Sequence, residues 1–436
     1  MDSYSKTLEH IYNLRGGVID LRLDRMERAL ALFEHPERTF TSLHIAGTNG
    51  KGSTSAMLHR ALSLAGYRTA LYTSPHLVSF TERMRIGDAE ISPDEVVCLA
   101  AEVRQRTETA GVPLTFFEFV TVMAFIYFAR QNIDVGVIEV GLGGRLDATN
   151  MVTPLVSVIT TISKDHEAYL GPDELSIARE KGGIIKAGVP VVCGKVSGEV
   201  ARLLQSIARG RGAPAYFLGA EFGFFLKNDG LFDYTGIKQT LADLKLGLRG
   251  RHQRANAALA LAALELAQTR FPVRESDLRD GLASVRWPGR LEVMYDRPMV
   301  LLDGAHNSEG VQALVDELAD LRQGRRIKLL FAAMADKEWE LMLRALARVA
   351  DEVMFTRVEM ERSADPVHLA AKLSAGIPCR VHLDAQEGLR ILLDEAEEDD
   401  IVVVAGSLYL LGEIRPLVQE FALARGRLEQ NSKPLF

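Results

Sequence analysis

A short glycine-rich stretch, residues 47–54 (Gly-Thr-Asn-Gly-Lys-Gly-Ser-Thr), carries the residue types that bind a phosphate group. Glycine allows backbone turns in which successive N–H groups point toward an anion. Lys51 adds a mobile positive charge, and the Ser53 hydroxyl stands where such loops place a magnesium ligand. A strand-like run precedes the stretch and a helix-like run follows it, which disfavours a chance glycine turn. The predicted nucleoside triphosphate site comprises Gly47, Thr48, Asn49, Gly50, Lys51, Gly52, Ser53 and Thr54.

Two further side chains that could bind magnesium lie at or after apolar runs. Magnesium prefers oxygen ligands and takes one or two protein carboxylates beside phosphate and water. Glu139 lies in the apolar run 135–140, where an unpaired carboxylate is costly to bury without a cation. Ser74 follows the run 69–73. In one interpretation, Glu139 and Ser74 bind the same magnesium ion as Ser53. In the alternative, Glu139 is a buried acid paired with another side chain and Ser74 is a simple turn residue.

His166 and Lys181 come after the apolar run 155–161. His166 follows Asp165 and is either a metal ligand or a structural hydrogen-bonding partner, since imidazole serves both purposes. Lys181 lies in the stretch Glu-Lys-Gly-Gly, and its pattern alone favours a solvated helix lysine.

Polar residues also follow two strand-like runs in the second half of the chain. Asp303, His306 and Asn307 stand in a turn after the run 299–302, and Ser407 follows the run 401–405. Ligands of open α/β sheets bind beyond the carboxyl ends of strands, so these residues indicate a polar site. For Asn307 a helix cap is the simpler explanation.

The elements that must position these residues alternate between apolar runs and helical periodicity, which predicts a mainly parallel sheet wrapped in helices. We expect strands at residues 42–46, 69–73, 135–140, 155–161 and 190–193, and helices at 55–65, 118–130 and 255–268. Residues 215–247 show short alternating segments with Gly and Asp turns, which predicts an antiparallel excursion.

A Pro-Gly break at residues 285–290 precedes a second series of strands near 299–302, 328–332, 352–356 and 401–405. A chain of 436 residues is longer than a single hydrophobic core usually serves, so it is expected to form more than one domain. We therefore predict an α/β protein with a P-loop ATPase domain at 1–287, built on a mainly parallel sheet, and a smaller Rossmann-like α/β domain at 288–436. Polar strand ends in both domains suggest a cleft that closes over substrates.

The composition excludes several functional classes. Basic residues are scattered and the net charge is −7, whereas a nucleic-acid surface needs clustered Lys and Arg. No apolar run is long enough to span a bilayer, and the first residues show no signal-peptide pattern. Three distant cysteines fit a reducing compartment. We expect a cytoplasmic protein without nucleic-acid or membrane partners, and we expect the acidic run 395–400 to be a solvated helix end.

These motifs resemble the folylpolyglutamate synthase/dihydrofolate synthase family of the Mur ligase superfamily, in particular its bifunctional bacterial type. The resemblance covers nearly the whole chain in order, and residues 139–150 carry its most specific motif. The other matching segments are 46–54, 72–77, 81–83, 165–166, 180–186, 287–291, 303–307 and 406–409.

The resemblance implies a role for each candidate. The glycine-rich stretch with Lys51 would bind ATP, with Ser53, Ser74 and Glu139 around a first magnesium ion. A second magnesium ion would be held by His166 and by Lys181 as its carbamate, which turns a cation into an anionic oxygen ligand. Asn256, Arg290 and Asp303 match nucleotide-contacting positions. The matching substrate positions are Leu21, Arg22, Leu23, Phe117, Glu118, Leu146, Asp147 and Ala148 on the pterin side, and His306 and Ser407 on the amino-acid side.

The activity implied is a ligase that uses ATP to activate a carboxylate as an acyl phosphate and joins it to L-glutamate. Its substrates would be dihydropteroate and reduced folates, and the family suggests a monomer. Arg22 departs from the family pattern, where glycine is usual. The alternatives are a folylpolyglutamate synthase only, a cell-wall Mur ligase and a regulatory P-loop ATPase. Only 46 residues precede Gly47, too few for the extra domain of cell-wall enzymes, and a regulatory ATPase would need no second domain with polar strand ends.

Overall fold

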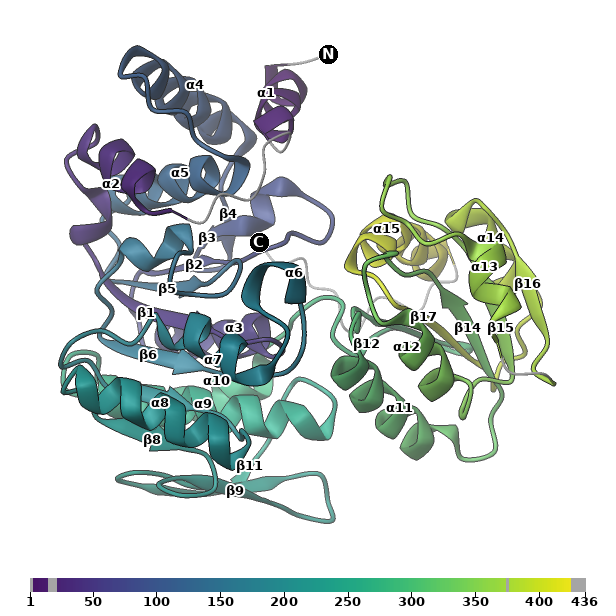
Figure 1. The fold of residues 1–436 in the computed structure, drawn as a ribbon. Coiled ribbons are helices and arrows are strands. Elements are labelled where there is room, and N and C mark those ends of the chain that lie inside the picture. The colour runs from purple at the N-terminus through teal and green to yellow at the C-terminus, as the bar shows by residue number, and fades with distance from the viewer. Residues whose placement is uncertain (1–2, 15–21, 374–375, 425–436) are drawn as a thin grey trace. The chain divides into compact units, whose positions relative to one another are not determined.

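The computed structural model describes residues 3–14, 22–373 and 376–424, and contacts within the chain divide it into two units (Figure 1). The first unit comprises Met1–Gly247 and Gln253–Val285, and the second comprises Leu248–His252 and Arg286–Phe436, each within the described residues. The domain ranges 1–287 and 288–436 stay a prediction.

The first unit contains a mixed sheet that is mainly parallel. Its central strand β1 (Thr41–Ala46) pairs in parallel with β5 (Val135–Glu139) and β6 (Val156–Ile159). In the described residues the strand order is β4-β3-β2-β5-β1-β6-β7-β8. The outer strands are β2 (Thr69–Tyr72), β3 (Met84–Ile86), β4 (Ala89–Glu90), β7 (Val191–Cys193) and β8 (Ala215–Phe217). Because β1, β2, β5 and β6 are parallel, the loops after them meet at one edge.

Helices surround this sheet (Figure 1). The most apolar is α5 (Phe116–Arg130), which is buried from Glu118 to Phe128 and has no polar face, so it lies in the core against α1, α2 and α4. A capping box of Thr115 and Glu118 begins it. The remaining elements are α1 (Ser3–Asn13), α2 (Asp24–Ala31), η2 (Pro36–Arg38), α3 (Lys51–Leu64), η3 (Phe80–Arg83), α4 (Pro93–Thr109), η4 (Ala148–Met151), α6 (Glu167–Leu170), α7 (Glu174–Gly182), α8 (Gly198–Gly210), α9 (Arg251–Ala267) and α10 (Glu275–Ser284).

The predicted α/β class is confirmed, and every predicted strand appears with ends that shift by at most two residues. The antiparallel prediction for 215–247 is wrong for β8, which pairs in parallel with β7. This strand follows α8, and a strand–helix–strand crossover leads to a parallel neighbour. The rest of that segment does form an antiparallel sheet, from β9 (Gly223–Leu226), β10 (Phe232–Thr235) and β11 (Thr240–Leu244).

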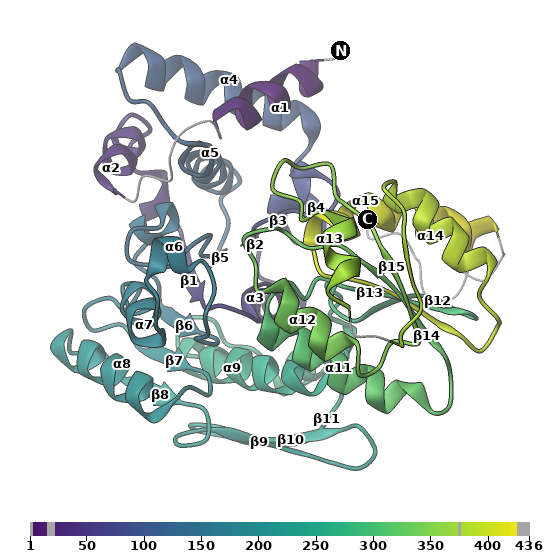
Figure 2. The same ribbon diagram turned by 45° about the vertical axis from the view of Figure 1, so that its right-hand side comes forward.

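The second unit is a smaller α/β sheet with the described strand order β12-β13-β17-β14-β15-β16. Only β12 is antiparallel to its neighbour within the described strands. Helices α11 and α12 pack together on one face and α14 and α15 on the other (Figure 2). The elements are β12 (Glu292–Asp296), β13 (Met299–Asp303), α11 (Ser308–Arg322), β14 (Ile327–Phe331), α12 (Trp339–Leu346), β15 (Glu352–Phe355), α13 (Pro366–Ala371), β16 (Cys379–Val381), α14 (Ala385–Asp394), β17 (Ile401–Ala405) and α15 (Leu408–Ala424).

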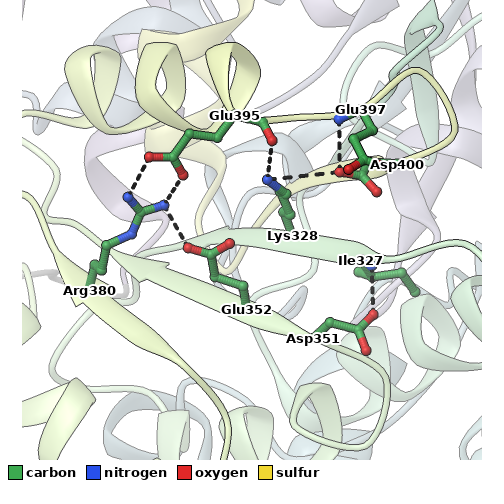
Figure 3. Close-up of polar contacts among 8 residues, drawn as sticks. All are labelled: Ile327, Lys328, Asp351, Glu352, Arg380, Glu395, Glu397 and Asp400. Carbon is green, nitrogen blue, oxygen red and sulfur yellow. Dashed lines mark hydrogen bonds and ion pairs between the residues drawn. The ribbon is translucent and has the colours of Figure 1, made fainter.

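The acidic run 395–400 follows the end of α14, and Glu395, Glu397, Glu398 and Asp399 are exposed as predicted, whereas its last residue, Asp400, is buried. Figure 3 shows Lys328 of β14 beneath the loop that this run forms. Its ammonium donates to the Glu395 carbonyl oxygen (2.6 Å) and lies 3.8 Å from the buried Asp400 carboxylate. Arg380 bridges Glu352 and Glu395 beside it. A lysine on a central strand needs a charge partner when it is buried, and the end of the acidic run supplies it.

Candidate functional site

The glycine-rich stretch forms the loop between β1 and α3. Gly50 has a φ of +86°, a left-handed conformation that glycine adopts without strain, and it directly precedes α3. The helix therefore begins at Lys51, earlier than the predicted residue 55. The Lys51 ammonium donates to the carbonyl oxygens of Gly47 (3.0 Å) and Thr48 (3.2 Å). The amino end of α3 faces this loop, and its free N–H groups favour an anion.

Two threonines after β6 hold the glycine-rich loop in place. Thr48 N donates to the Thr161 carbonyl oxygen (2.8 Å), and Asn49 N donates to Thr161 Oγ1 (2.9 Å). Thr160 Oγ1 donates to the Asn49 carbonyl oxygen (2.6 Å) and lies so close to Gly47 that a Cβ there would collide with it. Neither threonine was among the residues predicted for the site. The signal for them was a pair of hydroxyl residues at the end of an apolar run.

Asn256 lies beside the same loop although about two hundred residues separate them. It is buried on α9 and donates to Gln253 Oε1 (3.0 Å). Its amide occupies the space beside Gly50, where a Cβ would collide with it. The fold thus brings Asn256 to the loop for which the family resemblance selects it.

The carboxylate of Glu139 lies at the same edge of the sheet. Glu139 is the last residue of β5, is 4% exposed and is level with Ile45 of β1. Ser74 follows β2, the other neighbour of β5, and its N–H donates to Glu139 Oε2 (3.4 Å). Ser53 is buried in the first turn of α3. One buried carboxylate with serine hydroxyls is a donor set that fits magnesium bound to phosphate.

This set is not a cage made by protein side chains alone. Across residues 3–14, 22–373 and 376–424, no group of three or more His, Cys, Asp or Glu could hold a metal ion. Magnesium does not require such a group when phosphate oxygens and water complete its shell.

Lys181 lies in the last turn of α7 and is only 4% exposed. Burial, helped by the charge of Lys51, lowers the pKa of its ammonium to about 7, while Asp165 and Asp147 act in the opposite direction. The solvated lysine that the local pattern favoured is therefore not observed. At neutral pH a substantial fraction of this side chain is a neutral amine.

His166 lies in the loop before α6 with a φ of +53°. Its Nε2 is 3.9 Å from Asp165 Oδ1, and its backbone N–H donates to the same oxygen (2.8 Å). The His166 side chain is 43% exposed. Asp165 thus contacts His166 directly and acts through its charge on Lys181.

The predicted pterin-side segments lie together in the first unit. Leu21 lies outside the described residues, and Arg22 and Leu23 directly precede α2. Arg25 of α2 forms an ion pair with buried Glu118 of α5 (2.9 Å), and α2, α5 and η4 contact one another. Since Glu118 also caps α5, its carboxylate is committed to positioning these helices. Among the other candidates, Phe117 and Leu146 are half-buried and Ala148 is buried.

The Asp147 carboxylate is enclosed by its own loop. Oδ1 accepts from Thr149 N (3.0 Å) and Thr149 Oγ1 (2.5 Å), and Oδ2 accepts from Leu142 N (2.8 Å). The backbone of Gly141 is a further partner. Burial nevertheless raises the pKa of this carboxyl group. Asp147 therefore organises the loop after β5, and its predicted contact with the pterin stays a prediction.

In the second unit Asp303 and Arg290 lie at the carboxyl end of β13. The Asp303 carboxylate is buried and accepts from Leu291 N (2.8 Å) and Ala305 N (2.9 Å). Burial raises its pKa, although the charge of Arg290 and both hydrogen bonds oppose the shift. The Arg290 guanidinium lies against Gly304, where a Cβ would collide with it.

His306 and Ser407 come to the same edge of this sheet. Asp303 of β13 is level with Ala405 of β17, and buried Ser407 follows that strand. His306 Nδ1 is hydrogen-bonded to the carbonyl oxygen of Gly304 (2.8 Å). Asn307 Oδ1 accepts from Gly310 N (2.9 Å) at the start of α11, so the helix-cap alternative is correct for this residue.

Comparison with known proteins agrees with this arrangement. Residues 45–264 match the Mur ligase middle domain, and residues 289–408 match the Mur ligase glutamate ligase domain. The dihydrofolate synthase/folylpolyglutamate synthase of Bacillus subtilis is 35% identical over 407 residues, which are 90% of this chain and 94% of that protein. The chain belongs to the dihydrofolate synthase/folylpolyglutamate synthase family.

Solved structures of the dihydrofolate synthase/folylpolyglutamate synthase family have the same fold. Escherichia coli FolC in complex with DHPP and ADP matches with a TM-score of 0.89 and 32% identity, covering 97% of this chain and 98% of that one. The bifunctional Yersinia pestis enzyme with AMPPNP and a Mn ion matches with a TM-score of 0.85 and 30% identity over 98% of both chains. As a Mur ligase family member, the chain is a ligase.

Most candidate residues lie within the two matched Mur ligase domains. The glycine-rich loop lies in the matched middle domain with Glu139, Lys181 and Asn256. Arg290, Asp303, His306 and Ser407 all lie in the matched glutamate ligase domain. In the described part of the chain no helix combines the length and the apolar character that a membrane crossing requires.

Proposed function

We propose that this chain uses ATP to join L-glutamate to dihydropteroate and also to extend reduced folates with further glutamate. The observation that carries the proposal is the set of groups at one edge of the first sheet: a phosphate-binding loop, a buried carboxylate and a buried lysine with a pKa of about 7. The names of the bifunctional relatives support the choice of substrates.

The reaction needs a carboxylate to become an electrophile. A carboxylate oxygen of the pterin substrate attacks the γ-phosphorus of ATP, the bond to the β-phosphate oxygen breaks, and an acyl phosphate and ADP result. The amine of glutamate then attacks the acyl carbon, phosphate leaves with the C–O bonding pair, and the amine nitrogen loses a proton. Lys51 would turn from the loop carbonyls toward the phosphates and offset the charge that moves in the first step.

We propose that Ser53, Ser74 and Glu139 hold one magnesium ion, and that His166 and carbamylated Lys181 hold a second. Bound magnesium would neutralise phosphate charge and orient the γ-phosphoryl group. A carbamate forms when a neutral amine adds to carbon dioxide, and the lowered pKa of Lys181 supports this role because it supplies neutral amine at pH 7.

The remaining assignments are part of the same proposal. Asn256, Arg290 and Asp303 would contact the nucleotide, and His306 and Ser407 the amino acid. The pterin would contact the segment at Leu21, Arg22 and Leu23 together with Phe117, Glu118, Leu146, Asp147 and Ala148. We also propose a cytoplasmic monomer with domains at 1–287 and 288–436.

The test is a direct assay of the purified protein with ATP, magnesium and L-glutamate. Dihydropteroate and tetrahydrofolate are offered separately, and the products are identified by mass. Mass gains of one glutamate on both substrates are expected. Extension of tetrahydrofolate alone would make the protein a folylpolyglutamate synthase only. Phosphate release that does not depend on glutamate would instead favour a regulatory ATPase.

A further inference from the structure

A line of buried polar side chains connects β1 with the loop after β5. His44 lies inside β1, three residues before Gly47, and is fully buried. Its Nε2 is 2.9 Å from Thr149 Oγ1, which in turn lies 2.5 Å from Asp147 Oδ1. Thr149 is also fully buried. His44 has no part in the site described above, and Thr149 appears there only as a donor to the Asp147 carboxylate.

The donors along this line follow from the number of available protons. Both Asp147 oxygens accept from backbone N–H groups, of Thr149 and Leu142, and the Thr149 hydroxyl donates its one proton to Oδ1. His44 must then donate from Nε2, which leaves Nδ1 as a bare acceptor. In agreement, Nδ1 is buried and has no hydrogen-bond partner among the described residues. Burial, followed by the charge of Lys186, lowers the pKa of His44 to about 3, so the ring is neutral.

We propose that Thr149 and His44 are positioning residues that fix the orientation of the Asp147 carboxylate on the pterin side of the site. The inference rests on the proposed function, since it takes Asp147 as a contact of the pterin. The hydroxyl of Thr149 restrains Oδ1, and the His44 ring restrains that hydroxyl. Because His44 belongs to the strand that leads into the glycine-rich loop, the same line ties the pterin loop to the nucleotide loop. Fixed spacing of two reacting groups is a large part of catalysis in such enzymes.

The test compares two substitutions of Thr149. Thr149→Val keeps the shape and removes the hydroxyl, whereas Thr149→Ser keeps the hydroxyl. Loss of a hydrogen bond to a charged group should raise the KM for dihydropteroate roughly tenfold in Thr149→Val. Thr149→Ser should restore the KM to within about twofold of the wild-type value, and the KM for ATP should change little in either variant. A buried threonine on α4 gives the matched control, Thr107→Val, which should leave both KM values unchanged.

A double-mutant cycle shows whether Thr149 acts through Asp147. In an Asp147→Ala background, Thr149→Val should add no further rise in KM, because the group it positions is gone. A full tenfold additional rise there, or equal effects of Thr149→Val and Thr149→Ser, would overturn the proposal. If Thr149→Val does not fold, His44→Phe replaces it, since the ring keeps its size and loses the Nε2 donor.

A spectroscopic measurement separates this inference from the proposed function. Nitrogen-15 shifts of labelled histidine, assigned with His44→Phe, should show the Nε2–H tautomer for His44 in the wild type without any substrate. An Nδ1–H tautomer would overturn the positioning role whatever the enzyme acts on. The expected tautomer in a protein that glutamylates neither dihydropteroate nor tetrahydrofolate would instead refute the proposed function alone.

Discussion

Replacing Lys181 by methionine should stabilise the protein and abolish its ligase activity. Methionine has a similar length and is apolar, so it suits a position that is 4% exposed. In the wild-type protein, burial disfavours the charged form of the Lys181 amine. Removal of that amine removes the cost of keeping it there, and it also removes the group that we assign to the second magnesium ion.

The size of the effect depends on pH in a way that can be worked out. The pKa of Lys181 is lowered from 10.5 in the unfolded chain to about 7 in the folded protein. Between these values the unfolded state binds more protons, so the free energy of unfolding falls as the pH falls from 10.5 to 7. Integrated from pH 9 to pH 6, the wild-type protein loses roughly 2–3 kcal/mol through this residue. The Lys181→Met variant loses none of it.

The assay is urea unfolding of wild-type and variant protein at pH 6, 7.5 and 9, without nucleotide or magnesium, in buffer free of carbon dioxide. The exposed Lys195 provides the control Lys195→Met, which should leave the pH dependence of the wild type unchanged. Added bicarbonate should stabilise the wild type and not Lys181→Met, because binding to the native state alone raises stability. Parallel curves of unfolding free energy against pH for wild type and Lys181→Met would refute the reasoning.

Three further substitutions test other parts of the structure. Lys51→Ala should abolish glutamate-dependent phosphate release with an almost unchanged melting temperature, and wild-type turnover would contradict its place in the nucleotide loop. Glu139→Gln should lower kcat at least about 100-fold and shift the magnesium titration to higher concentrations, whereas an unchanged titration would make Glu139 a structural acid. Lys328→Met should lower the free energy of unfolding by about 3–5 kcal/mol because Asp400 stays buried without its partner. Lys328→Met combined with Asp400→Leu should recover most of that loss, and no recovery would contradict the ion pair.

The structure adds three kinds of information to the sequence prediction. It buries Lys181, which local pattern favoured as solvated, because α7 docks its last turn against the loop after β5. It makes the end of the acidic run at 395–400 the partner of a buried lysine. It also shows that the Asp147 carboxylate accepts hydrogen bonds from backbone N–H groups of its own loop. In each case the deciding partner is distant in sequence or lies in a loop whose shape no periodicity encodes.

The sequence by itself determined the class of the fold, the strands and the glycine-rich loop, because these depend on apolar periodicity and on backbone conformations that glycine favours. Only the tertiary structure decided which distant groups meet. Thr160 and Asn256 close on the glycine-rich loop through side-chain contacts that nothing in their local sequence specifies. The lowered pKa of Lys181 is likewise a property of its burial, since desolvation by the folded protein is its largest cause.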